Sequence, residues 1–306
     1  MAVSTEITFL HRLEAFFYNA AMSHFARMSF DKASDAGADW LRAIGPFTPA
    51  HRVALNNLRM AYPNESEAWR REIAQACWAQ LGRVTAEFPH LPEISFAPGN
   101  GRVELKGGEH LRAVRDSGKG AVFISGHFAS YEIMPIAIVQ AGVRCVMTYR
   151  PANNPIIDKS WLEIRQRYGA KLQAAKSRQG GMGLLRALKR GDSVALMNDQ
   201  KYNEGVAAPF FGYDAMTADG PARLAYQFDL PLMPMSVRRL NDRAQFLVEA
   251  HPPIPLDRAL PEAAAIKDAV TKVNQFVEAQ VRAAPEQWFW VHNRWPKEAW
   301  RKAGVI

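Results

Sequence analysis

Cysteine is scarce in this chain of 306 residues, which contains only Cys77 and Cys145. Two cysteines are too few for a disulfide framework or a cysteine-based zinc site, so we expect a reducing compartment. No segment has the 18 or more apolar residues of a membrane-spanning helix. The N-terminus also lacks the charged start, apolar middle and cleavage site of a signal peptide. These absences predict a protein that stays in the cytoplasm, although it need not be free of membranes.

Several catalytic and nucleotide-binding motifs are also missing. The glycine cluster of residues 180–183 fits neither the GxxxxGK[ST] phosphate loop nor a dinucleotide fingerprint. There is no GxSxG elbow of a serine hydrolase, no HExxH and no cysteine cluster that would hold a metal. The sequence therefore predicts no cofactor and no metal, and any chemistry must depend on a base and on electrostatics.

The chain is basic. Its 38 Lys and Arg residues exceed its 30 Asp and Glu residues, so the net charge is +8, and the isoelectric point is near 9.6. Such a charge favours polyanionic partners: nucleic acid, anionic lipid or an acidic carrier protein. No helix-turn-helix, zinc or RNA-binding signature is present, so the sequence predicts no nucleic-acid partner.

Two regions of different character follow one another along the chain. Residues 1–95 are expected to form an N-terminal helical segment that lies at a membrane surface or within the fold. Residues 50–90 predict two helices, separated by a break at 62–64. Residues 92–101 contain two prolines and two glycines and form the expected boundary to an α/β domain at 96–306.

The helix predicted within residues 6–30 has a broad apolar face that begins at Phe9. Two interpretations remain open. The helix packs against its own domain, or it lies in the membrane interface, for which its aromatic content, Arg12 and Arg27 are suitable. The basic tail at 294–302, which contains two tryptophans, leaves the same choice between a membrane-interface segment and a solvated helix.

Short β-like runs alternate with helical stretches from Val103 onward. The predicted strands are residues 102–105, 121–124, 143–148, 171–174, 193–198, 232–237 and 245–250. The predicted helices are residues 108–117, 129–141, 156–168, 179–190 and 219–229, followed by an amphipathic helix that carries Ile266 to Val281. Strands that alternate with helices predict an α/β fold, with a mostly parallel central sheet flanked by helices.

Polar side chains directly follow three of these predicted strands. They belong to His127, Arg150 and Asp199. Because ligands bind outside the carboxyl ends of parallel strands, we expect the three side chains to face one site. Histidine is suited to proton transfer near neutral pH, an aspartate can hold its tautomer, and arginine can bind a phosphate or carboxylate.

The position of Glu132 raises a question about the partner of His127. Five residues within one α-helix place two side chains about 140° apart, so Glu132 and His127 cannot share a helix face. Asp199 must therefore be weighed beside Glu132. Structural alternatives also stay open at this point: a buried core histidine, an aspartate that caps a turn, and a surface arginine.

The segment from His127 to Glu132 has the HxxxxE spacing of an acyltransferase motif. It resembles the bacterial lipid A biosynthesis acyltransferases, the lauroyl and myristoyl transferases, within the HxxxxD/E lysophospholipid acyltransferase superfamily. Other matching motifs, in chain order, are Asn57-Leu58-Arg59-Met60-Ala61-Tyr62-Pro63, Ser125-Gly126-His127-Phe128, Tyr149-Arg150-Pro151, Asn154-Pro155, Asp199-Gln200 and Pro209-Phe210-Phe211-Gly212. Residues 285–295 match a PEQ-x-x-W-x-H-x-R-(F/W) ending, so the resemblance covers roughly residues 50–296.

The resemblance implies transfer of a fatty acyl chain from an acyl thioester to a hydroxyl of a lipid or lipid A precursor. The donor is expected to be acyl-carrier protein or acyl-CoA. The enzyme is expected to be peripheral or weakly anchored at an anionic membrane surface, the cytoplasmic face of the inner membrane.

His127 is expected to be the general base, and the start of the helix that follows it is expected to stabilise the oxyanion. The catalytic residues expected are His127, Glu132 and Asp199, and the substrate-binding residues are Gly126, Arg150, Asn154 and Gln200. A non-catalytic lipid-binding protein and a glycerophospholipid-type acyltransferase with a different acceptor remain as alternatives.

Overall fold

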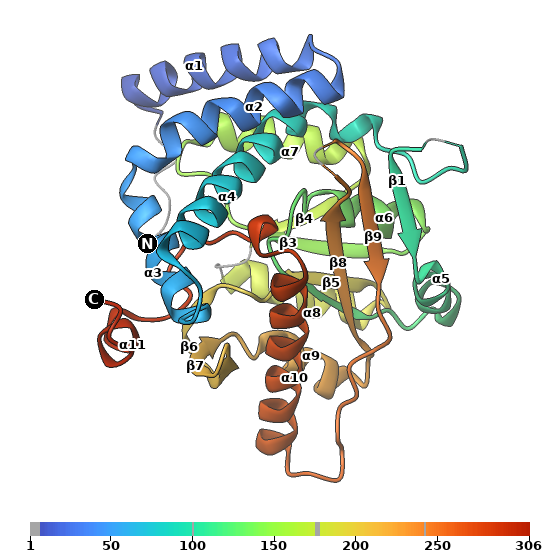
Figure 1. The fold of residues 1–306 in the computed structure, drawn as a ribbon. Coiled ribbons are helices and arrows are strands. Elements are labelled where there is room, and N and C mark those ends of the chain that lie inside the picture. Colours follow the sequence, from blue (N-terminus) through green and yellow to red (C-terminus); the bar gives the residue numbers. More distant parts are fainter. Residues whose placement is uncertain (1–6, 100, 175–177, 242) are drawn as a thin grey trace.

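A seven-stranded sheet lies at the centre of the computed structural model, which describes residues 7–99, 101–174, 178–241 and 243–306 (Figure 1). Its strand order is β1-β9-β8-β2-β5-β3-β4, and all neighbours are parallel except β8 and β9. The strands are β1 (Val103–Lys106), β2 (Val122–Ser125), β3 (Cys145–Tyr149), β4 (Lys171–Ala174), β5 (Ser193–Met197), β8 (Leu232–Arg239) and β9 (Phe246–Ala250). The predicted α/β fold with a mostly parallel sheet is confirmed.

Helices cover both faces of this sheet. They are α5 (Gly108–Ser117), α6 (Ile133–Gln140), α7 (Pro155–Arg167), α8 (Arg178–Lys189), α9 (Gly220–Phe228) and α10 (Glu262–Ala283). Side chains alternate along a strand, so Phe123 of β2 joins the core beneath α6, while Val122 and Ile124 join the core beneath α8, α9 and α10. All four residues of β2 are buried, as expected of a central strand.

Helices also form the N-terminal part of the chain. They are α1 (Phe9–Ala26), α2 (Phe30–Ile44), α3 (Pro49–Ala61) and α4 (Glu67–Glu87), with the 3₁₀ turns η1 (Gly45–Phe47) and η2 (Phe88–Glu93). Helices α2 and α4 cross where Gly37 meets Gly82, and a Cβ atom on Gly82 would overlap the carbonyl oxygen of Gly37. Leu58 of α3 and Cys77 of α4 lie in the same core cluster as Phe123 of the sheet.

Helix α1 lies at the top of Figure 1, above α2. Its Met22 and Phe25 are buried, and its Tyr18 hydroxyl accepts a hydrogen bond of 2.6 Å from the indole of Trp161 in α7. Its other face is uncovered: Phe9 is 80% exposed. In the described part of the chain, no helix is both long and apolar enough to cross a membrane.

Several elements differ from the sequence predictions. Helix α2 and the hairpin of β6 (Lys201–Phe210) and β7 (Tyr213–Thr217) were not predicted. Helix α6 begins four residues later than expected, because the backbone before it bends at Ala129, where φ is 39°.

The C-terminal tail contains the turn η3 (Pro285–Gln287) and the short helix α11 (Lys297–Lys302). Its tryptophans Trp295 and Trp300 are buried in the core, so they cannot rest at a membrane interface.

Candidate active site

The register of two central strands brings His127 and Asp199 together. Strands β2 and β5 are parallel neighbours, and Ser125 at the end of β2 pairs with Met197 at the end of β5. The Asn198 N–H donates to the Ser125 carbonyl at 2.8 Å, which extends this pairing by one residue. Two residues beyond each strand end stand His127 and Asp199, so the sheet itself positions the pair.

The Asp199 carboxylate is fully enclosed and receives three hydrogen bonds, each of 2.8 Å. Its Oδ1 lies beside His127 Nδ1, and its Oδ2 accepts from the His127 backbone N–H and from the indole N–H of Trp288. An imidazole that donates from Nδ1 is held in the tautomer whose Nε2 can accept a proton. The predicted partnership of His127 with an acid therefore falls to Asp199.

The His127 ring is open to solvent only in part, with 17% of its side chain exposed. Its ring lies against Tyr131, with ring centroids 4.9 Å apart, and against Phe289 at 5.8 Å. Among the described residues none is hydrogen-bonded to its Nε2. The His127 ring is therefore partly exposed and lies between two aromatic side chains.

Electrostatics favour the charged form of both partners. Burial lowers the pKa of His127, but the charge and hydrogen bond of Asp199, together with the charge of Glu132, raise this pKa above its ordinary value. Burial raises the pKa of Asp199, but the charge and hydrogen bond of His127 outweigh it and hold this pKa well below its usual range. The protonated imidazolium form of His127 is thus stabilised at this site.

His292 is a second histidine near the pair, stacked on Phe289 at 5.7 Å between ring centroids. Burial lowers the pKa of His292 to about 4, with the Asp199 charge opposing and the His127 charge adding to this shift. Burial likewise lowers the pKa of Arg294 to about 10. His292 is therefore neutral at pH 7, and its two ring nitrogens are buried without a partner among the described residues.

Glu132 lies apart from His127 and forms an ion pair with Arg165 of α7. The Arg165 Nε donates to Glu132 Oε2 at 3.0 Å, its Nη2 bonds to the other carboxylate oxygen, and the Tyr168 hydroxyl donates at 3.4 Å. Glu132 therefore fastens the loop before α6 to α7 and affects His127 through its charge alone. Sequence reasoning missed Arg165, because it lies 33 residues away from Glu132.

The start of α6 was the expected oxyanion site. The N–H groups of Ile133 and Met134 there donate to the carbonyl oxygens of Ser130 and Tyr131. These two donors are therefore engaged within the loop.

The four predicted substrate-binding residues occupy different surroundings. Gly126 is buried, and a Cβ atom there would lie 2.7 Å from the ring of Phe128. Arg150 and Gln200 are exposed beside the strand ends, and Arg150 donates a hydrogen bond of 3.2 Å to the Asn153 side chain.

Asn154 is a buried N-cap of α7. Its side chain accepts from the Ile156 N–H at 3.0 Å and donates to the His11 carbonyl and to Glu14, both in α1. It therefore joins α1 to the edge of the sheet where His127 lies.

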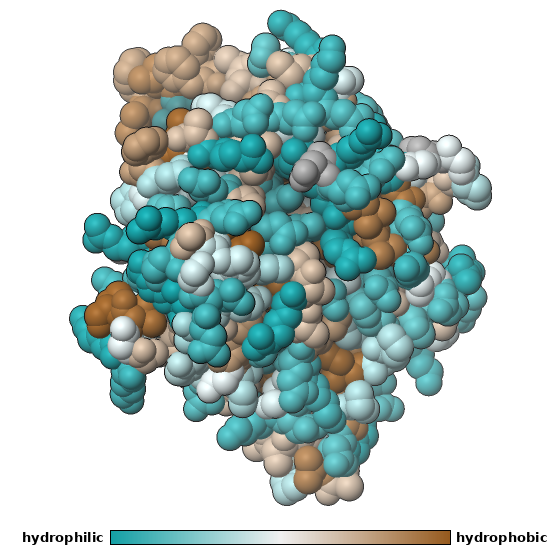
Figure 2. Space-filling model, in the orientation of Figure 1, coloured by the Kyte–Doolittle hydropathy of each residue, from teal (hydrophilic) through white to brown (hydrophobic). Residues whose placement is uncertain are grey.

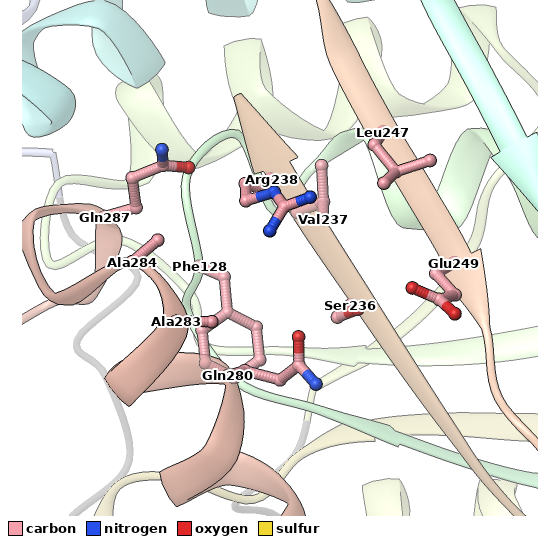
Figure 3. A pocket seen from close by; sticks show the side chains of 10 residues that line it. All are labelled: Phe128, Ser236, Val237, Arg238, Leu247, Glu249, Gln280, Ala283, Ala284 and Gln287. Carbon is pink, nitrogen blue, oxygen red and sulfur yellow. The ribbon is translucent and has the colours of Figure 1, made fainter. Parts of the chain in front are cut away.

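A small cavity lies next to the loop that follows β2, with the ring of Phe128 and the side chains of Ser236 and Gln280 facing it (Figure 3). Its volume of about 50 Å³ is enough for water but far below the ~300–1,000 Å³ of typical ligand pockets. A groove of about 770 Å³ outside α3 contains none of the predicted site residues. Across residues 7–99, 101–174, 178–241 and 243–306, no group of three His, Cys, Asp or Glu side chains is arranged to hold a metal.

Comparison with known proteins gives a consistent result. Residues 1–297 match the sequence profile described as bacterial lipid A biosynthesis acyltransferase. The chain is 30% identical to the lipid A biosynthesis lauroyltransferase of Escherichia coli K12, over 79% of this chain and 78% of that protein. It is 26% identical to the lipid A biosynthesis acyltransferase of Haemophilus influenzae, over 78% and 73%.

One solved structure is also similar, the 1-acyl-sn-glycerophosphate (LPA) acyltransferase of Thermotoga maritima. It is 12% identical over 91% of this chain and 99% of that one, with a TM-score of 0.40, which is too low to bear on fold or function. The sequence profile, which spans nearly the whole chain, decides the family. The protein is an acyltransferase and belongs to the bacterial lipid A biosynthesis acyltransferase family.

Proposed function

We propose that this enzyme transfers a fatty acyl chain from an acyl thioester to a hydroxyl group of a lipid A precursor. The observation that carries the proposal is the His127–Asp199 pair at the carboxyl edge of the sheet, where no described residue is hydrogen-bonded to Nε2 of His127. The relatives are lipid A biosynthesis acyltransferases, which favours lipid A as the acceptor class. The donor is an acyl thioester of acyl-carrier protein or of coenzyme A, and the net charge of +8 would attract either of these anionic carriers.

In this mechanism His127 Nε2 removes the proton of the acceptor hydroxyl while the hydroxyl oxygen attacks the thioester carbonyl carbon. Asp199 keeps the proton on Nδ1 and stabilises the imidazolium that forms. The tetrahedral intermediate then collapses, the C–S bond breaks, and the imidazolium returns its proton to the departing thiolate. The products are an ester and a free thiol, so no covalent acyl-enzyme is needed.

Arg150 and Gln200 are exposed polar residues near these strand ends, and we assign them to the acceptor. The guanidinium of Arg150 offers a planar fork that fits a phosphate group of the acceptor. Gly126 serves the site indirectly, because its lack of a side chain leaves room for Phe128 beneath the loop.

The experiment that tests this function compares wild-type enzyme with His127→Gln, using acyl-carrier-protein and coenzyme A thioesters with a purified lipid A precursor. Mass spectrometry of the lipid reports the added acyl chain. We expect His127→Gln to lose at least about 100-fold in rate, as expected for removal of a general base. His110→Gln, a change on α5, is the matched control and should retain the wild-type rate. Equal rates for wild type and His127→Gln would refute the proposed base.

A lipid-binding protein without activity is the second candidate, and the same assay separates it. Such a protein would bind the precursor yet add no acyl chain with either donor. Acylation of a lysoglycerophospholipid in place of the lipid A precursor would instead identify a glycerophospholipid-type enzyme.

The site would also have to reach a lipid in a membrane, and we assign this contact to α1. Apolar side chains project from its uncovered face: Ile7 just before it, then Phe9, Leu10, Leu13, Phe16 and Phe17. Figure 2 shows this apolar surface as brown side chains over α1, at the upper left. An exposed helix face rich in phenylalanine and leucine, with Arg12 and Arg27 alongside, is suited to insertion among anionic headgroups. Asn154 links this helix to the strand edge that carries His127.

Liposome sedimentation tests the membrane contact. Phe9→Ser combined with Phe16→Ser changes two side chains that are 80% and 67% exposed, so the fold should be unaffected. We expect binding to vesicles of phosphatidylglycerol and phosphatidylethanolamine to fall at least about tenfold. Leu260→Ser, in the loop before α10 at the opposite end of the molecule (Figure 1), is the control. Equal sedimentation of the double variant and the control would exclude α1 as the contact.

A further inference from the structure

The C-terminal segment Gln287–Trp288 holds both halves of the His127–Asp199 pair. Its Gln287 carbonyl accepts a hydrogen bond of 2.7 Å from the Ala129 N–H, and Trp288 forms an isolated antiparallel β-bridge with Phe128. The indole N–H of Trp288 then donates to Asp199 Oδ2 at 2.8 Å. One short segment thus touches the loop of the histidine and the carboxylate of the aspartate.

Trp288 is itself fixed firmly in place. It is 1% exposed, and its carbonyl accepts a hydrogen bond of 3.2 Å from the Cys77 thiol of α4. The side chain of Gln287 bonds twice to the backbone of Arg239 in β8, at 2.8 Å and 3.2 Å. A buried side chain anchored on both sides can orient a neighbour with little freedom to move.

We propose that Trp288 is a positioning residue of the active site, whose indole N–H holds Asp199 in the orientation that keeps the proton of His127 on Nδ1. The inference rests on the proposed role of His127 as general base.

The chemistry of the carboxylate explains why this donor matters. Asp199 is enclosed, and both hydrogen bonds other than that of Trp288 come from His127 itself. Without the indole N–H, Oδ2 keeps one donor, so the carboxylate becomes more basic and binds the imidazolium more strongly. His127 would then hold its proton to higher pH and be a poorer base at neutral pH. Glu132, which also raises the pKa of His127 through its charge, and the neighbouring His292, which is neutral at pH 7, would be unchanged.

The chain provides a matched control in Trp290. Trp288 and Trp290 pack edge to face, with ring centroids 4.6 Å apart, and both are almost fully buried. The indole of Trp290 also donates a hydrogen bond, but to the Pro285 carbonyl at 2.6 Å. Trp288→Phe and Trp290→Phe therefore remove the same atoms from the same cluster, and only the first removes a donor to Asp199.

The test is the pH dependence of kcat/KM for acyl transfer by wild type, Trp288→Phe and Trp290→Phe. We expect Trp288→Phe to shift the acidic limb of the kcat/KM profile to higher pH by on the order of one unit. The same change should lower kcat about tenfold at pH 7 and leave KM unchanged. Trp290→Phe should keep the wild-type limb. Superimposable profiles for wild type and Trp288→Phe, or equal displacements in both variants, would overturn the proposal.

Two further measurements keep the result decisive. Replacing Trp288 by 3-benzothienylalanine retains the ring shape and substitutes sulfur for the N–H, so it should reproduce the upward displacement even if Trp288→Phe folds poorly. An NMR titration of the His127 Cε1–H signal, identified by its loss in His127→Gln, needs no turnover. If wild type transfers no acyl chain, the proposed function fails, but this titration still tests the role of Trp288. The same titration midpoint for His127 in wild type and in Trp288→Phe would refute that role.

Discussion

Asp199→Asn is the sharpest perturbation of the proposed pair, because the geometry leaves an amide no satisfactory arrangement. The two oxygens of Asp199 accept from three N–H groups. If the asparagine oxygen faces His127 Nδ1, its NH₂ group must face two donors, the His127 backbone N–H and the Trp288 indole. If the amide is flipped, its NH₂ group donates to Nδ1 and moves the histidine proton to Nε2, which can then no longer act as a base.

Either arrangement lowers the rate, by an amount that the known effects bound. General base catalysis contributes about 10²–10⁴-fold, and a histidine held in the wrong tautomer loses most of it. We therefore expect kcat for acyl transfer to fall about 10³-fold. Because the Asp199 charge raises the pKa of His127, the residual activity should show an acidic limb at lower pH than in wild type.

The assay is single-turnover acyl transfer at saturating acceptor, with thermal unfolding measured in parallel. Glu132→Gln is the comparison, because Glu132 pairs with Arg165 and acts on His127 only through its charge. That change should lower the unfolding temperature, since Arg165 is left as a buried unpaired charge. If folded Asp199→Asn kept more than about a third of the wild-type rate while folded Glu132→Gln lost it, Glu132 would be the partner and the reasoning would be wrong.

Three other outcomes follow from buried contacts. Glu87 and Arg239 form a fully enclosed ion pair, and the Glu87 carboxylate also accepts hydrogen bonds from the hydroxyls of Ser34 and Ser130. Glu87→Gln should therefore lower the free energy of unfolding by about 3–5 kcal/mol in urea titrations. Glu298→Gln, a change at an exposed side chain, is the control and should have little effect. Gly82→Ala should cost about 3 kcal/mol in the same assay, because its methyl group would push α4 away from Gly37 of α2; full stability would show that this crossing adapts. The pKa of His292 is lowered to about 4, so between pH 6.5 and 4 only the unfolded chain binds this proton and stability falls as the pH falls. His292→Asn should therefore remove about 2 kcal/mol of the destabilisation that wild type suffers between pH 7.5 and 5, and a parallel pH dependence in both proteins would contradict the assignment.

The sequence was most informative where a signal is local. The apolar run at 121–124 predicted the central strand, and three strand ends followed by His127, Arg150 and Asp199 predicted a common edge. The hairpin was missed although Phe211 and Gly212 form its two-residue turn, both with positive φ, as such turns require. The Asn154-Pro155 pair was also a readable helix start, with an N-cap followed by proline.

What the sequence could not predict depends on contacts between distant segments. The sequence left Glu132 and Asp199 both open as the partner of His127, and the pairing of Glu132 with Arg165 depends on where α7 packs against the loop before α6. The donor from Trp288 to Asp199 joins residues 89 positions apart. Neither contact leaves a periodic pattern in the sequence, because each is created only when the sheet has formed and the later segments pack against it.

The segment Gln287–Trp288 also sets the order in which this enzyme matures. A ribosome makes about 5–20 residues per second, and it finishes the sheet strands before it reaches Trp288. The nascent chain can therefore pair β2 with β5 and bring His127 beside Asp199 while the carboxylate still lacks its third donor. Under the proposed roles, full acyl-transfer competence arrives only after Trp288 has been made and its indole has packed against Asp199.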